Sequence, residues 1–274
     1  MSVFAVAPDK CNFCGMCAIE CPAGIIVIKD PEGLPSLADG GEAMCMNCGH
    51  CVAVCPPGAI RLKTMKPEDC ALVSTELLPA PEQVEHFLLS RRSVRVYRED
   101  PVPREMLAKL IDIARYAPSA HNSQPVQWLV IEDTKEVKRL TGLVVDWMRS
   151  LIKESPWLAD LLPLDLIVAA WESGVDVIMR DAPHVIVGHA HRDSASAQND
   201  GVIALTYLEL AAYSLDLGAC WAGFFHFAAT SYPPMLEALQ LPEGHQCLGA
   251  MMIGYSKHKL RRIPLRNEPT IIWR

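Results

Sequence analysis

The 274-residue chain lacks several features that would assign it to common functional classes. It has no excess of basic residues, and its formal net charge of -7 argues against a general nucleic-acid binder. No G-x-G-x-x-G motif follows a candidate strand, so nothing indicates a separate dinucleotide-binding domain. The most apolar helical stretch, residues 201–217, is interrupted by Glu209 and Asp216 and suits a buried helix better than a membrane span.

The first residues also lack the pattern of a secretion signal. Met1-Ser2-Val3-Phe4 shows no basic start followed by an apolar run and a small-residue cleavage site. Together with eight cysteines in ligand-like spacing, this favours a reducing compartment. We therefore expect a cytoplasmic protein with neither a nucleic-acid nor a membrane partner.

What the sequence does contain is a duplicated cysteine motif. The spacing C-x2-C-x2-C-x3-C-P occurs first at Cys11, Cys14, Cys17 and Cys21, and again at Cys45, Cys48, Cys51 and Cys55. Three thiolates spaced in this way can wrap one face of a cubane cluster, while the fourth, followed by Pro, reaches the other cluster. The spacing predicts two [4Fe-4S] clusters, the first held by Cys11, Cys14, Cys17 and Cys55 and the second by Cys45, Cys48, Cys51 and Cys21.

Zinc is the alternative reading, because paired C-x2-C motifs also describe zinc ribbons. A zinc site needs four ligands and gives no reason for a third cysteine two residues on, a fourth before Pro, or the repetition of the whole set. The pattern therefore favours clusters.

Residues 1–65 resemble a bacterial-type two-cluster ferredoxin. The resemblance rests on the cysteine spacing, on Gly15 and Gly49 inside the motifs, and on Ala23-Gly24-Ile25 and Pro57-Gly58-Ala59-Ile60 after them. A domain this small should be held together by its clusters more than by a core. The cysteine pattern fades over residues 66–81, where Leu78-Pro79-Ala80-Pro81 is typical of a linker, and residues 82–274 form the second domain.

The second domain has the periodicities of an α+β fold. We expect a helix opened by Pro81, a second opened by Pro103, and a strand over 128–131 followed by a long amphipathic helix through 137–151. Further expectations are strands over 183–187 and 247–253, and the longest helix over 198–217. Residues 156–174 have poor helical phase and are expected to form a lid. Helices and strands are mixed without strict alternation, which favours α+β over a doubly wound sheet.

Two polar segments of this domain suggest a phosphate-bearing ligand. Ser90-Arg91-Arg92-Ser93-Val94-Arg95 places three guanidinium groups within six residues, and arginine forks bind phosphate oxygens in pairs. A solvated basic patch is the plainer reading of that run. Residues 117–125 contain several short polar side chains between two prolines. This composition fits a turn, and it also fits a set of hydrogen-bond donors for the pyrimidine edge and ribityl hydroxyls of a flavin.

Together these segments resemble the nitroreductase family of FMN enzymes, and the resemblance extends over residues 81–274. Two later blocks support it: residues 218–224 resemble the family segment that lies along the isoalloxazine, and residues 254–264 resemble its C-terminal phosphate-binding strand end. The resemblance implies FMN at the interface of a homodimer, built around the helix over 198–217.

The resemblance also implies roles for individual residues. Phosphate and ribityl groups would be held by Arg91, Ser93 and Arg95, with Arg92 beside them, and by Arg262 at the phosphate. The partner subunit would supply Pro118, Ser119, Ala120 and Asn122, with Gln124 nearby, and the ring would be contacted by Trp221, Ala222 and Gly223. Family members often place a Lys two residues before the last Arg, where this chain has Leu260; Lys259 or Arg261 is the candidate replacement.

These inferences predict an oxidoreductase that passes electrons between [4Fe-4S] clusters and FMN to reduce a small nitroaromatic- or quinone-like acceptor in a ping-pong cycle. NAD(P)H or a low-potential electron carrier is the expected donor. No side chain stands out as a general acid, and the resemblance implies that solvent can supply the second proton. The alternatives are a non-enzymatic carrier that delivers electrons to a protein partner, and another flavin reaction such as dehalogenation or dehydrogenation on the same scaffold.

Overall fold

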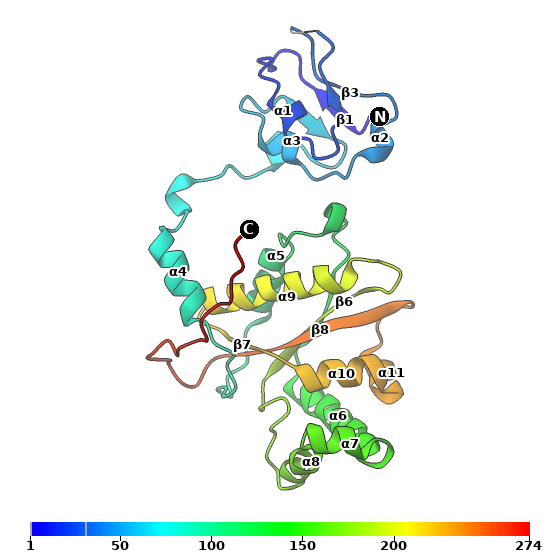
Figure 1. Cartoon of the computed structure of the whole chain (residues 1–274), viewed down its shortest axis with the longest axis vertical. Helices are drawn as coiled ribbons and strands as arrows, with labels where there is room; N and C mark the ends of the chain where they lie inside the picture. Colours follow the sequence, from blue (N-terminus) through cyan, green and yellow to red (C-terminus); the bar gives the residue numbers. More distant parts are fainter. Residues whose placement is uncertain (1, 31) are drawn as a thin grey trace. The chain divides into compact units, whose positions relative to one another are not determined.

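A computed structural model describes residues 2–30 and 32–274 (Figure 1). The chain forms two compact units. The first runs through Pro79 and also includes Ala120–Ser123, and the second comprises Ala80–Ser119 and Gln124–Arg274.

Short elements separated by turns make up the first unit. They are β1 (Phe4–Val6), α1 (Met16–Ile19), β2 (Ile26–Val27), β3 (Ser36–Leu37), α2 (Gly41–Met44), α3 (His50–Ala53), β4 (Ile60–Leu62) and the 3₁₀ turns η1 (Pro67–Asp69), η2 (Thr75–Leu77) and η3 (Ala120–Asn122). β1 pairs antiparallel with β4, and β2 pairs antiparallel with β3. The apolar core of this unit is small, and the buried Cys17 and Cys51 form part of it.

The two cysteine motifs share one backbone conformation. Gly15 and Gly49 have φ of 73° and 78°, and each immediately precedes a four-residue helix, α1 or α3. Phe13 and Asn47, two residues earlier in each motif, also have positive φ, 56° and 50°. Only a residue without a Cβ adopts the left-handed region without strain, which explains a glycine after the second cysteine of each motif. The repeat in sequence is therefore also a repeat in structure.

The second unit contains the larger elements. They are α4 (Pro81–Ser90), α5 (Arg104–Ala114), β5 (Gln127–Ile131), α6 (Thr134–Glu154), α7 (Pro156–Leu161), α8 (Leu164–Glu172), β6 (His184–His191), α9 (Ala197–Ser214), β7 (Gly218–Trp221), α10 (Gly223–Ser231), α11 (Pro233–Leu239) and β8 (His245–Gly254). The predicted helix starts near Pro81 and Pro103 are confirmed, as are the predicted strands and the long helix after the first of them.

A four-stranded antiparallel sheet organises this unit, with strand order β5-β6-β8-β7. α9 packs on one face, and α6 and α10 pack on the other (Figure 1). Side chains of β6 alternate between the two faces, because successive residues of a strand point to opposite sides. Ile186 thus packs with α5 and α9, while Val185 and Val187 join the core under α6 and α10. The α+β fold class is confirmed.

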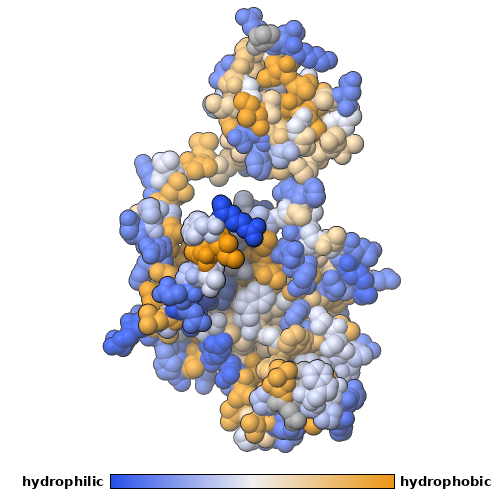
Figure 2. Space-filling view, in the orientation of Figure 1, coloured by the Kyte–Doolittle hydropathy of each residue, from blue (hydrophilic) through white to orange (hydrophobic). Residues whose placement is uncertain are grey.

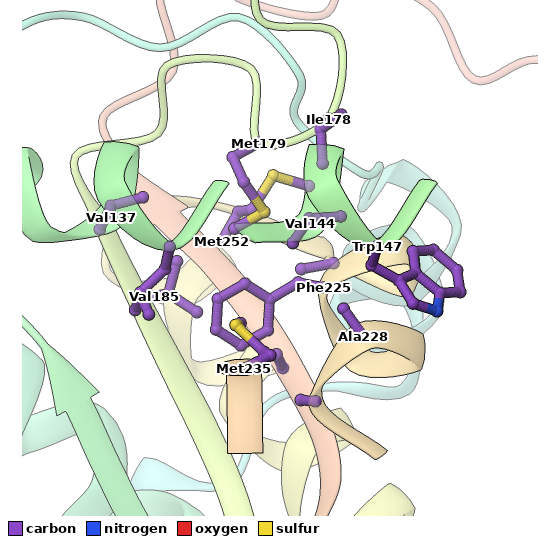
Figure 3. Close-up of a cluster of buried hydrophobic side chains, with 14 of the residues drawn as sticks. Val137, Val144, Trp147, Ile178, Met179, Val185, Phe225, Ala228, Met235 and Met252 are labelled. Atoms are coloured by element: carbon purple, nitrogen blue, oxygen red, sulfur yellow. The ribbon is translucent and has the colours of Figure 1, made fainter. Parts of the chain in front are cut away.

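The larger core lies between the sheet and helices α6, α10 and α11. Phe225 is at its centre, with Met235, Met252 and Val144 around it (Figure 3). These side chains are fully or almost fully buried. Burial of a large apolar side chain contributes about 1.5–3 kcal/mol, so this core fixes α10 and thereby the β7–α10 turn that precedes it.

Two expectations need correction. The longest helix is α6 with 21 residues, whereas α9 has 18 and ends at Ser214 instead of 217. The stretch with poor helical phase over 156–174 contains two short helices, α7 and α8, whose periods do not join across Pro163. Leu164 and Val168 of α8 are buried in the core beside α6.

Among the described residues, no helix is both long and apolar enough to cross a membrane. The face shown in Figure 2 intersperses hydrophilic and hydrophobic residues.

Close packing between α9 and β8 generates a stability prediction. A Cβ added to Gly201 would lie 2.6 Å from Leu248 Cβ, whereas a Cβ on Gly142 in α6 would have no atom within 4 Å. Gly201→Ala should therefore lower the free energy of unfolding by about 1–3 kcal/mol through overpacking. Gly142→Ala should raise it by about 0.5–1 kcal/mol, because alanine has the higher helix propensity. Denaturant unfolding followed by circular dichroism measures both, and equal effects of the two changes would contradict this packing.

Candidate functional site

Seven of the eight motif cysteines fall into two sets within the first unit. The pKa of the Cys17 thiol is raised by burial, and the neighbouring Cys55 and Cys14 raise it as well. The pKa of Cys51 is raised to about 11, first by burial and then by Cys48, with further contributions from Cys21 and Cys45. Each set thus includes the fourth cysteine of the other motif, and the crossed ligand sets themselves stay a prediction of the spacing.

The second set surrounds an apolar hollow. Cys21, Cys45, Cys48 and Cys51 line it together with Phe4, Ile26 and Leu37. Crowded, buried thiols resist ionisation, so holding them as thiolates requires a positively charged group such as iron. No three His, Cys, Asp or Glu side chains among the described residues are placed to share one metal ion. A cubane places a separate iron at each thiolate, so its ligands need not converge on one point.

A second candidate site lies where the segment after α4 meets α9 and β7. Arg91 Nη1 donates to Glu209 Oε1 at 2.7 Å, and the Glu209 carboxylate lies in the middle of α9 with only 8% of the residue exposed. Trp221, like Arg91, acts on this carboxylate to lower its pKa. Burial nevertheless raises the pKa of Glu209 above its ordinary value, against the opposing effect of Arg91.

Ser93 and Arg95 continue along the same side of the segment toward β7. The backbone N–H of Val94 donates to Ala219 O at 2.9 Å, which fixes the segment beside β7. Burial raises the pKa of the Cys220 thiol, and Arg95 and a hydrogen bond with Ser93 oppose that rise. Arg91, Ser93, Arg95 and Trp221, expected to act together, are thus brought together around Glu209 and Cys220.

Ala222 and Gly223, the other two residues expected to contact the flavin ring, form the turn after β7. Ala222 is buried, and Gly223 begins α10. The Trp221 side chain packs over Gly249 of β8, where an added Cβ would lie 2.8 Å from the indole. This packing leaves the indole little freedom.

Arg92 points to the opposite side of the segment from Arg91 and Ser93. It lines a cavity of about 360 Å³ together with Leu260 and Lys259 from the C-terminal tail. Arg262 is exposed further along that tail. Arg92 and Arg262 are therefore not part of the Glu209 cluster.

The polar loop expected to contribute from a partner subunit lies apart from that cluster. Pro118, Ser119 and Gln124 line a separate cavity against Asp200 of α9, and the Gln124 N–H donates to Ser119 Oγ at 3.0 Å. Ala120 and Asn122 group with the first unit, where Asn122 Nδ2 donates to Asn47 O at 3.0 Å.

Sequence reasoning missed three residues of these sites. In the sequence Glu209 only interrupts an apolar stretch, although an acid in such a stretch indicates a buried cationic partner. Arg180, whose charge acts on Cys220, adopts a left-handed conformation with φ of 59°, and no sequence signal pointed to it. Arg98, which lines the cavity beside Arg92, could have been found from the alternation of residues 92, 94, 96 and 98.

The fold and the two sites define a class of protein: a redox protein that joins a cysteine-rich cluster unit to an antiparallel α+β unit carrying a basic ligand site. Comparisons with known proteins specify the family. The model of the nitroreductase family matches residues 88–255, more than half of the chain. The model of the 4Fe-4S dicluster domain matches residues 10–60.

Individual relatives agree with this assignment. The chain is 26% identical over 180 residues to "FMN reductase [NAD(P)H]" of Bacillus subtilis, covering 65% of this chain and 67% of the relative. It is 28% identical over 208 residues to a Thermus thermophilus protein named "NADH dehydrogenase", covering 68% and 93%. A nitroreductase with bound FMN from Bacteroides fragilis shares the fold, with a TM-score of 0.58, 21% identity, and coverage of 70% of this chain and 99% of that one.

The chain therefore belongs to the nitroreductase family and carries an N-terminal 4Fe-4S dicluster domain. Membership of this family makes it an FMN-dependent oxidoreductase.

The buried pair between Arg91 and Glu209 can be tested by a double-mutant cycle. Removing either partner leaves the other charge poorly solvated, so Arg91→Ala and Glu209→Ala should each cost about 1–3 kcal/mol, and their coupling energy should be about 1–2 kcal/mol at pH 7.5. Because the folded-state pKa of Glu209 is raised, lowering the pH through that pKa neutralises the carboxylate, and the coupling should shrink. A coupling that stays near zero at pH 7.5 would show that the pair does not hold the segment on α9.

The control is the exposed pair of Arg139 and Glu136, whose charged groups lie 2.7 Å apart. The cycle of Arg139→Ala and Glu136→Ala should give a coupling energy of at most about 0.5 kcal/mol.

Proposed function

We propose that the protein passes electrons between two [4Fe-4S] clusters and FMN and reduces a small organic acceptor, nitroaromatic- or quinone-like, in a ping-pong cycle. The observation that carries this proposal is the presence, on one chain, of a dicluster domain and a nitroreductase domain. A carrier domain supplies electrons singly, and the second domain provides a basic site in which a flavin can meet a small molecule.

For the clusters, we propose the crossed ligand sets. Cys11, Cys14, Cys17 and Cys55 hold the first cluster, and Cys45, Cys48, Cys51 and Cys21 hold the second. The mutual influence of Cys17, Cys14 and Cys55, and that of Cys51 with the other three, supports this division. The backbone N–H of Ala59 donates to Cys55 Sγ at 3.2 Å, a contact of the kind that stabilises negative charge on a cluster sulfur.

The residues of the second unit fit FMN by the chemistry of their donors. Arg91, held by Glu209, and Ser93 offer charged and neutral donors to the ribityl chain, and Arg95 adds positive charge near the β7 strand end. Trp221, Ala222 and Gly223 present a flat aromatic side chain and a close backbone to the ring. When bound, FMN supplies the ability to gather electrons one at a time and to release two as a hydride.

The loop carrying Pro118, Ser119, Ala120, Asn122 and Gln124 completes the site from a second subunit in this proposal, so we propose a homodimer. The donor is NAD(P)H or a low-potential electron carrier, and the protein acts in the cytoplasm. The names of the two relatives, an NAD(P)H-linked FMN reductase and an NADH dehydrogenase, support a nicotinamide donor.

Two sets of variants should separate the two cofactors. Arg91→Ala combined with Arg95→Ala removes charge-assisted hydrogen bonds and should weaken flavin binding by about 100-fold or more, while iron content stays unchanged. Cys14→Ser should lower iron from roughly eight to roughly four atoms per chain and leave FMN bound. Iron, sulfide and flavin analysis of purified protein measures both.

The matched control for the arginine pair is Arg139→Ala combined with Arg149→Ala, which removes two exposed, ion-paired arginines of α6. This variant should keep both cofactors. Full FMN stoichiometry in the Arg91/Arg95 variant would show that the flavin assignment is wrong.

A test of acceptor reduction separates the enzyme from a non-enzymatic carrier. Protein reduced under argon and mixed with a nitroaromatic or a quinone should be reoxidised within seconds, with one two-electron product formed for each pair of electrons lost. A pure carrier would stay reduced until a protein partner was added. Persistence of the reduced spectrum with every small acceptor tried would therefore reject the proposed activity.

A further inference from the structure

Three histidines gather on one face of the sheet, where β6 ends and β8 begins. His189 and His191 are two residues apart on β6. Successive residues of a strand point to opposite faces, so both imidazoles lie on the same face. In the antiparallel register His191 is opposite His245 of β8, and His189 is opposite Cys247. One strand thus supplies two imidazoles, and the neighbouring strand supplies a third.

The three rings are close to one another. His189 Nδ1 lies 3.0 Å from His245 Nδ1, and the centroids of these two rings are 5.1 Å apart. The ring of His191 meets that of His245 edge-on, with 5.8 Å between centroids and 90° between planes. His189 is buried, with 5% of the residue exposed, whereas His191 is exposed. The group therefore extends from the interior to the solvent, and a dissolved ion can reach it.

A hydrogen bond between His189 and His245 needs no third imidazole, because one neutral ring donates and the other accepts. His191 takes no part in that bond. Its Nδ1 accepts from the backbone N–H of Asp193 at 3.3 Å, and its Nε2 lies against Gly244. The neutral ring of His191 thus has its lone pair on Nδ1, the nitrogen that can act as a ligand.

The charges beside the group offset each other. Asp193 Oδ2 lies 3.5 Å from His191 Nδ1. Arg192 carries the opposite charge, and its Nε donates to Gly244 O at 3.3 Å. The affinity of this place for a cation therefore depends on the imidazoles.

Imidazole nitrogen is a common ligand of zinc and of other divalent transition metals. With each nitrogen about 2.0–2.1 Å from a tetrahedral zinc ion, two neighbouring nitrogens are about 3.3 Å apart. The Nδ1 atoms of His189 and His245 are within about 0.3 Å of that separation. His191 does not direct a nitrogen to the same point, in keeping with the absence of a converged three-ligand group among the described residues. Exposed side chains change rotamer within nanoseconds, and His191 would give up only a long hydrogen bond.

We propose that His189, His191 and His245 bind a divalent transition-metal ion such as zinc, with His191 rotating to complete the ligand set. A fourth position is left to water. The ion would reinforce the junction of β6 and β8, where Arg192 N already donates to Gly244 O at 2.9 Å. The site uses no residue of the cysteine sets or of the Glu209 cluster, so the inference goes beyond the proposed function and does not rest on it.

The test measures zinc binding to the full-length protein with its clusters intact. The protein is titrated with zinc in competition with a fluorescent zinc indicator, and zinc and iron are then counted by elemental analysis after gel filtration. We expect one zinc ion per chain with no loss of iron. His245→Ala should weaken zinc binding by about 100-fold, and His191→Ala by about tenfold or more, because each removes one ligand.

Three variants keep the test decisive. His86→Ala removes an exposed histidine of α4 and should leave the zinc affinity unchanged. His245→Gln keeps a hydrogen-bonding side chain beside His189 and should still bind zinc weakly, which separates a ligand from a structural partner. His191 is exposed, so His191→Ala leaves the fold intact even if His245→Ala lowers stability.

Several outcomes would overturn the inference. Absence of zinc from the unaltered protein would remove the site. Zinc retained at full affinity by a variant with all three histidines replaced by alanine would place the ion elsewhere, and iron lost in proportion to zinc gained would place it at the cysteines. An unchanged affinity in His191→Ala would reject the three-ligand set. Because the readout is zinc and not turnover, failure of the proposed flavin chemistry would leave this result unaffected.

Discussion

The ion pair between Arg91 and Glu209 determines where the basic segment lies. It joins residues 118 positions apart, and it attaches the chain leaving α4 to the centre of α9. Ser90 Oγ lies 2.8 Å from Tyr213 OH, and the Phe87 ring packs against the Tyr213 ring. These contacts extend the attachment by one turn of α4 and one turn of α9. With the segment held on α9 and hydrogen-bonded to β7, its side chains are divided between two faces, one toward Glu209 and Cys220 and one toward the Arg98 cavity. A buried carboxylate costs stability unless a cation compensates it, so the pair constrains both the sequence and the geometry of the site.

In the first unit the equivalent constraint is the proposed crossing of cysteine ligands between two short motifs. Each motif contains only a four-residue helix and a few turns, which cannot enclose a core by themselves. A shared fourth cysteine would make each proposed cluster a link between the two halves and would couple cluster binding to folding.

The sequence predicted those parts of the protein in which function imposes a local pattern. The cysteine spacing is fixed by the shape of a cluster, so both motifs could be read without a structure, and the helices opened by Pro81 and Pro103 follow from the fixed backbone angle of proline. The partner of Arg91 and the position of Arg98 beside the cavity that Arg92 lines could not be read in this way. Both depend on contacts between residues far apart in the chain, which no local periodicity records. The two short helices after α6 were missed because each is too short to establish a period.

The most direct test of the central claim, that clusters and flavin exchange electrons within this protein, is an anaerobic electron count. Protein of measured iron and flavin content is titrated with dithionite, and separately with NADH and NADPH, and is then reoxidised with a known amount of a two-electron acceptor. If clusters and flavin exchange electrons, the protein should take up about four electrons per chain, two at the flavin and one at each cluster, and should deliver all of them to the acceptor. Discharge of only the two flavin electrons, with the clusters left reduced in the presence of excess acceptor, would contradict it.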